Sequence, residues 1–141
     1  MTTVYLAAAF SRQVEIRTVA EDLRNLGVSV CARWLDEQKC PENQNFEDFL
    51  ADNALNDLQD LETCDTIVRF SDIIQSEMVP AKLISGARMF ETGYSYKAGK
   101  RVIVIGGRQN VFDRLPGIIH LDTVENLKTM LKTEVIREHK N

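Results

Sequence analysis

Two acidic side chains fall on helix faces that are otherwise apolar. In residues 45–63 the apolar side chains recur at the spacing of an amphipathic helix, in a stripe of Phe46, Phe49, Leu50, Ala54, Leu58 and Leu61. Asn53 and Asp57 lie on this stripe, whereas Asp60 does not. A buried carboxylate without a partner costs several kcal/mol or becomes protonated. Asp57 therefore marks either a ragged edge of the stripe or a functional site.

The segment Gly86–Gly99 repeats this pattern. We expect a helix here, with an inner face made of Ala87, Phe90, Tyr94 and Ala98. Glu91 lies among these residues. A pair between Arg88 and Glu91 is the alternative explanation, but such a pair contributes only a few tenths of a kcal/mol. Both helices flank the apolar run Asp65–Phe70, so Asp57 and Glu91 are expected to converge on one cleft.

Two converging carboxyl groups are suited to glycosyl transfer. In that chemistry one carboxylate attacks the anomeric carbon and holds the sugar as an ester, while a second group handles the proton of the leaving group. Glu91 falls in the second turn of its helix, where the positive helix end favours the ionised form. Asp57, if buried and protonated, is placed to donate to the departing base.

Apolar strands and helices alternate along the chain and position these residues. The strands are expected at Thr3–Ala7, Val28–Ala32, Asp65–Phe70, Arg101–Ile105 and Ile118–Leu121. A helix capped by Ser11 is expected to end at Gly27, and a closing helix to begin at a capping box of Asp122 and Glu125. Residues Arg33–Asn43 have no consistent period and are expected to form a loop.

This alternation predicts the fold class. Strands that are continuous apolar runs are typical of a parallel sheet covered on both faces. We therefore expect a single α/β domain over residues 1–141, with a doubly wound, flavodoxin-like or Rossmann-like parallel sheet of five strands and a polar tail near 135–141. In such sheets the ligand binds beyond the carboxyl ends of the strands.

The composition excludes several function classes. The formal net charge of −4 leaves no basic footprint for a nucleic acid polymer. We expect no metal and no other cofactor. The chain has only two histidines and three widely spaced cysteines, and it contains no glycine-rich nucleotide motif. The first residues lack a basic segment followed by a long apolar one, so no signal peptide is expected, and no apolar run approaches the roughly 20 residues that a membrane span needs. We expect a cytoplasmic protein without a membrane partner.

Three motifs, in order, resemble the nucleoside 2-deoxyribosyltransferase superfamily. The run Ser85-Gly-Ala-Arg-Met-Phe-Glu91-Thr-Gly-Tyr is similar to the nucleophile segment of that family, a small-residue turn followed by E-x-G-Y. Asn56-Asp57-Leu58, with Asp65 eight residues after Asp57, resembles the preceding helix and strand, and Val4–Ala7 resembles the first strand. The segment Asn110–Pro116 also occurs in short members of the family.

The resemblance implies roles for matching residues. Glu91 aligns with the nucleophile that carries the deoxyribosyl intermediate, and Asp57 with the residue that contacts the base and assists proton transfer. Tyr5 aligns with an aromatic residue that orients the nucleophile and the sugar, although strand packing explains it equally well. Phe10 is implied as an apolar wall for the base, and Asn53, on the stripe of Asp57, is a further substrate-binding candidate.

Ser85 departs from the typical transferases, which have an aspartate six residues before the nucleophile. A serine there resembles the related 2′-deoxynucleoside 5′-monophosphate N-hydrolases. The Ser85 hydroxyl and the Gly86 amide stand at an expected helix N-terminus, where donors favour a phosphate, and Arg88 adds a cation. The alternative is that Ser85 only caps its helix.

The implied function is cleavage of the N-glycosidic bond of 2′-deoxyribonucleosides or their 5′-monophosphates, through an ester on Glu91. Transfer of the sugar to another base is the first interpretation, hydrolysis is the alternative, and a non-catalytic nucleotide-sensing domain is the alternative from another class. Family members complete their sites with a neighbouring subunit, which implies a homo-oligomer, a dimer or larger. Arg108 and Asn110 are candidates to reach a neighbour's ligand or are ordinary loop residues, and Trp34 is expected to pack on the core.

Overall fold

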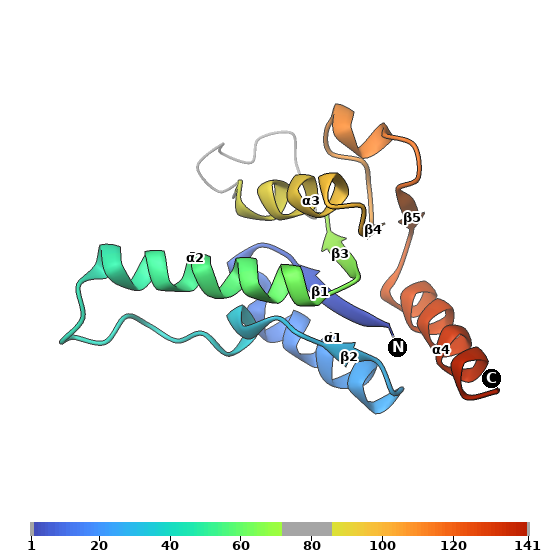
Figure 1. Ribbon diagram of the computed structural model, residues 1–141, viewed down its shortest axis with the longest axis horizontal. Helices are drawn as coiled ribbons and strands as arrows, with labels where there is room; N and C mark the ends of the chain where they lie inside the picture. The colour runs from blue at the N-terminus through green and yellow to red at the C-terminus, as the bar shows by residue number, and fades with distance from the viewer. Residues whose placement is uncertain (1, 72–85, 141) are drawn as a thin grey trace.

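The computed structural model describes residues 2–71 and 86–140, whose strands form one parallel sheet (Figure 1). The strands are β1 (Thr3–Ala7), β2 (Ser29–Val30), β3 (Thr66–Phe70), β4 (Arg101–Ile105) and β5 (Ile119–Leu121). Their order is β2-β1-β3-β4-β5, and every neighbouring pair is parallel. The predicted doubly wound, five-stranded α/β domain is confirmed.

Helices cover both faces of this sheet. The α-helices of the described residues are α1 (Gln13–Asn25), α2 (Phe46–Thr63), α3 (Ala87–Lys97) and α4 (Val124–Lys140). The same described residues also contain the 3-10 helices η1 (Phe10–Arg12), η2 (Arg33–Asp36) and η4 (Val111–Arg114). α1 contacts α4, and α2 contacts α3, as Figure 1 shows for the two layers. Within the described ranges, none of the helices has the length and apolar character needed to cross a membrane.

The core lies where the central strands meet these two layers. β1, β3 and β4 are buried almost throughout, which explains why their sequences are continuous apolar runs rather than alternating ones. α1 contributes Ile16, Val19, Ala20 and Leu23, and α4 contributes Leu127 and Leu131. As predicted, α1 ends next to Gly27, which has a φ of 91°.

Several local predictions were wrong by a few residues. Ser11 lies within η1, and α1 begins after Arg12 without a side-chain cap. At α4 the cap is Thr123, whose Oγ1 accepts a hydrogen bond from the Asn126 amide at 3.1 Å, rather than Asp122. Thr123 is a competent cap one residue closer to the helix, so it displaces the predicted Asp122–Glu125 box.

The elements between β1 and α2 also differ from the prediction. β2 is only two residues long because Val28 and residues 31–32 lie outside the paired segment. The first residues of the predicted loop 33–43 form η2. Trp34 in η2 is buried, as expected, and its indole Nε1 donates to the Leu6 carbonyl oxygen at 2.7 Å.

The inner faces of α2 and α3 were predicted only in part. In α3 the buried residues are Arg88, Thr92 and Ser95, whereas Phe90 is 63% exposed. The amino-terminal half of α2 extends beyond the sheet in Figure 1, so Phe46 and Leu50 are exposed. These differences arise because local periodicity defines a stripe, but the neighbouring elements decide which part of the stripe is covered.

A buried ion pair links β3 to the segment after β4. Arg69 Nη2 lies 2.7 Å from Asp113 Oδ2, and both side chains are 1% exposed. Asp113 also accepts a hydrogen bond from the Gln109 amide at 2.7 Å, which holds η4 against the sheet. The buried positive charge of Arg69 is therefore compensated by the negative charge of Asp113.

Asp113→Ala should lower the free energy of unfolding by about 3–5 kcal/mol, because it leaves the Arg69 guanidinium buried without a counter-charge. Urea denaturation of the wild type and the variant measures this difference. Asp122→Ala, which removes an exposed acid, is the control and should change stability by less than about 0.5 kcal/mol. A loss below about 1 kcal/mol in Asp113→Ala would contradict a structural role for the pair.

Candidate functional site

Tyr5 and Glu91 meet between the sheet and the α2–α3 layer. Tyr5 is the central residue of β1, where it pairs with Ile67 of β3, and it is fully buried. Side chains alternate between the faces of a strand, so Tyr5 and Val4 point to opposite helix layers. The Tyr5 hydroxyl donates a hydrogen bond to Glu91 Oε2 on α3. The predicted proximity of these two residues is thus present in the structure.

The Glu91 carboxyl group is easily protonated. Burial raises its pKa, the hydrogen bond from Tyr5 lowers it, and the nearby Asp57 raises it, with the result at about 7. This corrects the expectation that the helix N-terminus keeps Glu91 ionised, because the loss of hydration outweighs the helix dipole. At neutral pH the carboxyl group therefore exchanges readily between its two forms.

Tyr5 supplies a neutral donor to this group. Burial raises the pKa of the Tyr5 hydroxyl far above its ordinary value, and the Glu91 and Asp57 carboxylates raise it further. The phenol consequently stays protonated over the whole physiological range. It orients one oxygen of Glu91 without adding a permanent positive charge, which leaves the other oxygen available for chemistry.

Asp57 on α2 belongs to the same electrostatic environment. Burial raises its pKa to about 6, Glu37 and Asp60 raise it in addition, and Arg33 lowers it. The Asp57 carboxylate also raises the pKa values of Glu91 and Tyr5, so it lies within electrostatic range of both. Of the three predicted catalytic residues, Tyr5 and Glu91 are in direct contact, and Asp57 acts on both of them electrostatically. The pKa values of Asp57 and Glu91 both lie near neutrality.

Arg33 and Asp60 fix the segment after β2 against α2. The Arg33 amide donates to Asp60 Oδ2 at 2.8 Å, and Arg33 Nε lies 3.0 Å from Asp60 Oδ1. Asp60 was predicted to lie off the buried stripe, yet it is 7% exposed because this partner compensates its charge. The sequence contained one sign of this arrangement, an acid one helical turn after Asp57, but it did not identify the partner.

Two adjoining cavities lie on this side of α2. A cavity of about 140 Å³ is lined by Arg33, Trp34, Asp36, Glu37, Asn53, Asn56 and Asp57. A groove of about 1060 Å³ beside it is lined by Phe10, Asn53, Glu37 and the exposed half of α2, among others. Phe10 and Asn53, both predicted to bind substrate, thus lie where a ligand near Asp57 would extend. Glu37 was missed by the sequence analysis because it falls in a segment without periodicity.

The predicted phosphate-binding residues are only partly described. Ser85 lies outside the described residues. Gly86 is exposed at the start of α3, where no side chain caps the helix. Arg88, by contrast, is 1% exposed on the inner face of α3 rather than open to solvent. Of the two predicted phosphate-binding residues that the structure describes, Gly86 is accessible and Arg88 is not.

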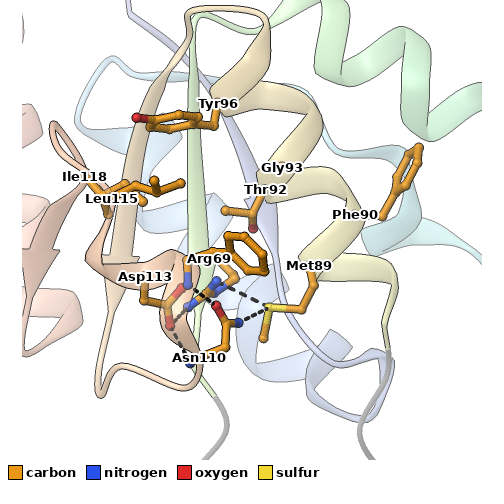
Figure 2. A pocket seen from close by; sticks show the side chains of 11 residues that line it. Arg69, Met89, Phe90, Thr92, Gly93, Tyr96, Asn110, Asp113, Leu115 and Ile118 are labelled. Carbon is orange, nitrogen blue, oxygen red and sulfur yellow. Dashed lines mark hydrogen bonds and ion pairs between the residues drawn. The ribbon is translucent and has the colours of Figure 1, made fainter.

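Asn110 lies in a different part of the molecule, shown in Figure 2. Its side chain accepts a hydrogen bond from the Phe112 amide at 2.8 Å and begins η4, and the preceding Arg108 is exposed. It lines a cavity of about 410 Å³ between α3 and η4, whose floor holds Arg69 and Asp113. Phe90 points away from the other labelled side chains in this view. Asn110 therefore lines a different cavity from the two beside Asp57.

Searches by sequence give no match: neither a protein-family model nor a curated protein corresponds to this chain. In the described residues, no group of three or more histidine, cysteine, aspartate or glutamate side chains is arranged to hold a metal ion.

Comparison of the folds does give matches over nearly the whole chain. A 2-deoxyribosyltransferase from Bacillus psychrosaccharolyticus is 18% identical with a TM-score of 0.66, covering 92% of this chain and 96% of that one. The CMP N-glycosidase BcmB of Clostridium botulinum is 18% identical with a TM-score of 0.59, covering 94% and 99%. A conserved protein from Enterococcus faecalis V583 is 15% identical with a TM-score of 0.64, covering 95% and 99%. The chain has the same fold as a 2-deoxyribosyltransferase and a CMP N-glycosidase.

Proposed function

We propose that this protein cleaves the N-glycosidic bond of 2′-deoxyribonucleosides or their 5′-monophosphates through a covalent 2-deoxyribosyl ester on Glu91. The observation that carries the proposal is the hydrogen bond from the buried Tyr5 hydroxyl to Glu91, beside a second carboxyl group on Asp57. The shared fold with a 2-deoxyribosyltransferase and a CMP N-glycosidase supports it.

The reaction has two halves. Ionised Glu91 attacks C1′ of the sugar while the C1′–N bond breaks, and that bond's electron pair passes to the base nitrogen. Protonated Asp57 delivers its proton to the base, which leaves in its neutral form. In the second half an acceptor attacks C1′ and passes its proton to the Asp57 carboxylate, while the C1′–O bond to Glu91 breaks and the Glu91 carboxylate departs. Tyr5 holds Glu91 in place throughout because its phenol stays protonated.

Transfer to a second base is the leading form of the proposal. Hydrolysis is the alternative, because transfer and hydrolysis share the first half-reaction. The serine at position 85 favours this alternative, since it resembles the 5′-monophosphate N-hydrolases, in which water is the acceptor. A non-catalytic nucleotide-sensing domain is less well supported, because binding alone needs no titratable pair of carboxyl groups.

A homo-oligomer, a dimer or larger, is part of this proposal. Phe46, Leu50 and Leu55 on α2 and Phe112 in η4 are large apolar side chains exposed on the single chain. Contiguous exposed apolar side chains are typical of surfaces that bind another protein, and Phe46 and Leu50 line one groove together. Asn110 lines a different cavity from Asp57, which fits a role in a neighbour's site.

Glu91→Ala should reduce release of the base by roughly a thousandfold or more while the fold persists, since the variant lacks the nucleophile. Chromatography of the bases released from 2′-deoxynucleosides and their 5′-monophosphates measures the rate. Glu21→Ala, an exposed acid on α1, is the control and should be fully active. Activity of Glu91→Ala within tenfold of the wild type would refute the assignment.

Asp57→Asn should slow base departure by about 10² to 10⁴ with little change in KM, because asparagine cannot deliver a proton. The reaction needs ionised Glu91, whose pKa is about 7, so its ionisation makes activity rise with pH. It also needs protonated Asp57, whose pKa is about 6, so the loss of that proton makes activity fall with pH. The wild-type optimum should therefore lie between these values, and Asp57→Asn should lose the alkaline decline. A 2-deoxyriboside whose leaving group needs no proton should recover most of the rate; equal slowing of that substrate would exclude Asp57 as the acid.

The wild type should prefer a 5′-monophosphate over the bare nucleoside by about a hundredfold in kcat/KM. Two charge-assisted hydrogen bonds to the phosphate, from Ser85 and the amides at the start of α3, suffice at about 1.5–3 kcal/mol each. The ratio is measured in the wild type and in Ser85→Asp, which restores a repelling carboxylate. Equal constants in the wild type would remove the phosphate argument, and a preference that survives Ser85→Asp would place the phosphate elsewhere.

A further inference from the structure

Glu37 stands where the two cavities beside Asp57 adjoin. Its side chain lines both the small cavity that contains Asp57 and the larger groove next to it, a position that it shares with Asn53. Asp57 opens into the smaller of these cavities, so the space beside Asp57 and Glu37 is available to a base that receives a proton from Asp57. Glu37 therefore lies within the volume that recognises the base, provided that the proposed function holds.

The backbone around Glu37 is held in place by α1. Gln13 Nε2 donates to the Glu37 carbonyl oxygen at 3.0 Å and to the Trp34 carbonyl oxygen at 2.6 Å. Arg17 Nη2 donates to the Leu35 carbonyl oxygen at 2.6 Å. These bonds to the carbonyl groups of Trp34, Leu35 and Glu37 fix the segment, so the Glu37 side chain starts from a defined backbone position.

The Glu37 carboxyl group itself has no partner in the described part of the chain. It accepts no hydrogen bond and forms no ion pair there, although the side chain is half-buried and burial raises its pKa. A partly desolvated acceptor without a donor is unfavourable unless a ligand supplies one. No hydrogen bond joins Glu37 to the neighbouring Asp57 in the described part of the chain, although the two side chains line the same cavity.

We propose that Glu37 selects the leaving base by accepting a hydrogen bond from an exocyclic amino group, so that the enzyme prefers cytosine and adenine to their keto counterparts, uracil and hypoxanthine. Glu37 and Asp57 then present one acceptor and one donor to the edge of the base. Glu37 acts on specificity through this contact, and it also favours the protonated form of Asp57.

The edges of the bases match this arrangement unequally. Adenine has an amino donor at N6 next to an acceptor at N7, and cytosine has an amino donor at N4 next to the acceptor N3. Each edge pairs its amino group with Glu37 and its ring nitrogen with protonated Asp57. Uracil and hypoxanthine have a carbonyl oxygen in place of this amino group. That oxygen would face a Glu37 carboxylate oxygen, and neither atom carries a proton to form a hydrogen bond.

The test compares kcat/KM for matched substrates that differ only in this group. The pairs are the 5′-monophosphates of 2′-deoxycytidine and 2′-deoxyuridine, and those of 2′-deoxyadenosine and 2′-deoxyinosine. The wild type should favour the amino member by about tenfold to a hundredfold, which is the range for a hydrogen bond to a charged group. In Glu37→Gln the preference should fall about tenfold, mainly through KM, since glutamine also donates to a carbonyl oxygen. Glu42→Gln, an exposed neighbour outside both cavities, should retain the wild-type ratio.

A second measurement separates this inference from the reaction itself. Isothermal titration of the same four nucleotides into Glu91→Ala and into Glu91→Ala with Glu37→Gln reports recognition without turnover. Tighter binding of the amino nucleotides that is lost with Glu37→Gln supports the inference, even if the wild type proves to release no base and the proposed function fails. Equal binding of amino and keto nucleotides, or a preference unchanged in Glu37→Gln, overturns it.

Discussion

The hydrogen bond between Tyr5 and Glu91 joins the centre of the sheet to α3, and the geometry of the site depends on it. β1 lies between β2 and β3, so Tyr5 cannot move without disturbing the sheet. Enclosing Glu91 removes much of its hydration, and a single neutral donor compensates only part of that loss. The result is a fixed carboxyl group that remains able to change its protonation state near neutral pH.

The same fold holds a second buried carboxyl group in the opposite electrostatic condition. Asp113 pairs with the Arg69 guanidinium and accepts backbone hydrogen bonds, and these partners hold its pKa below the ordinary value despite burial. Asp113 is therefore permanently ionised and serves to attach η4 to the sheet. The contrast with Glu91 separates structural from reactive acids: a cationic partner fixes the charge, whereas a phenol leaves it variable.

The segment after β2 contacts both β1, which carries Tyr5, and α2, which carries Asp57. Arg33 binds the Asp60 carboxylate on α2, and the Trp34 indole binds the Leu6 carbonyl oxygen on β1. Since α1 holds the residues that follow, the position of Glu37 relative to Asp57 depends on contacts to β1, α1 and α2 together. A change in any one of these contacts would alter the relation between the acceptor and the donor that face the base.

The sequence alone determined the sheet and the helices that carry the two central acids. Continuous apolar runs separated by amphipathic segments have one physical outcome, strands buried on both faces by helices. Asp57 and Glu91 were identifiable because each interrupts an apolar stripe. The tertiary structure decided what the stripes could not: that Arg88, Thr92 and Ser95 rather than Phe90 face the core, that Asp60 is buried against Arg33, and that Glu37 lies beside Asp57. Periodicity describes one element at a time, whereas burial and protonation depend on partners far away in the sequence.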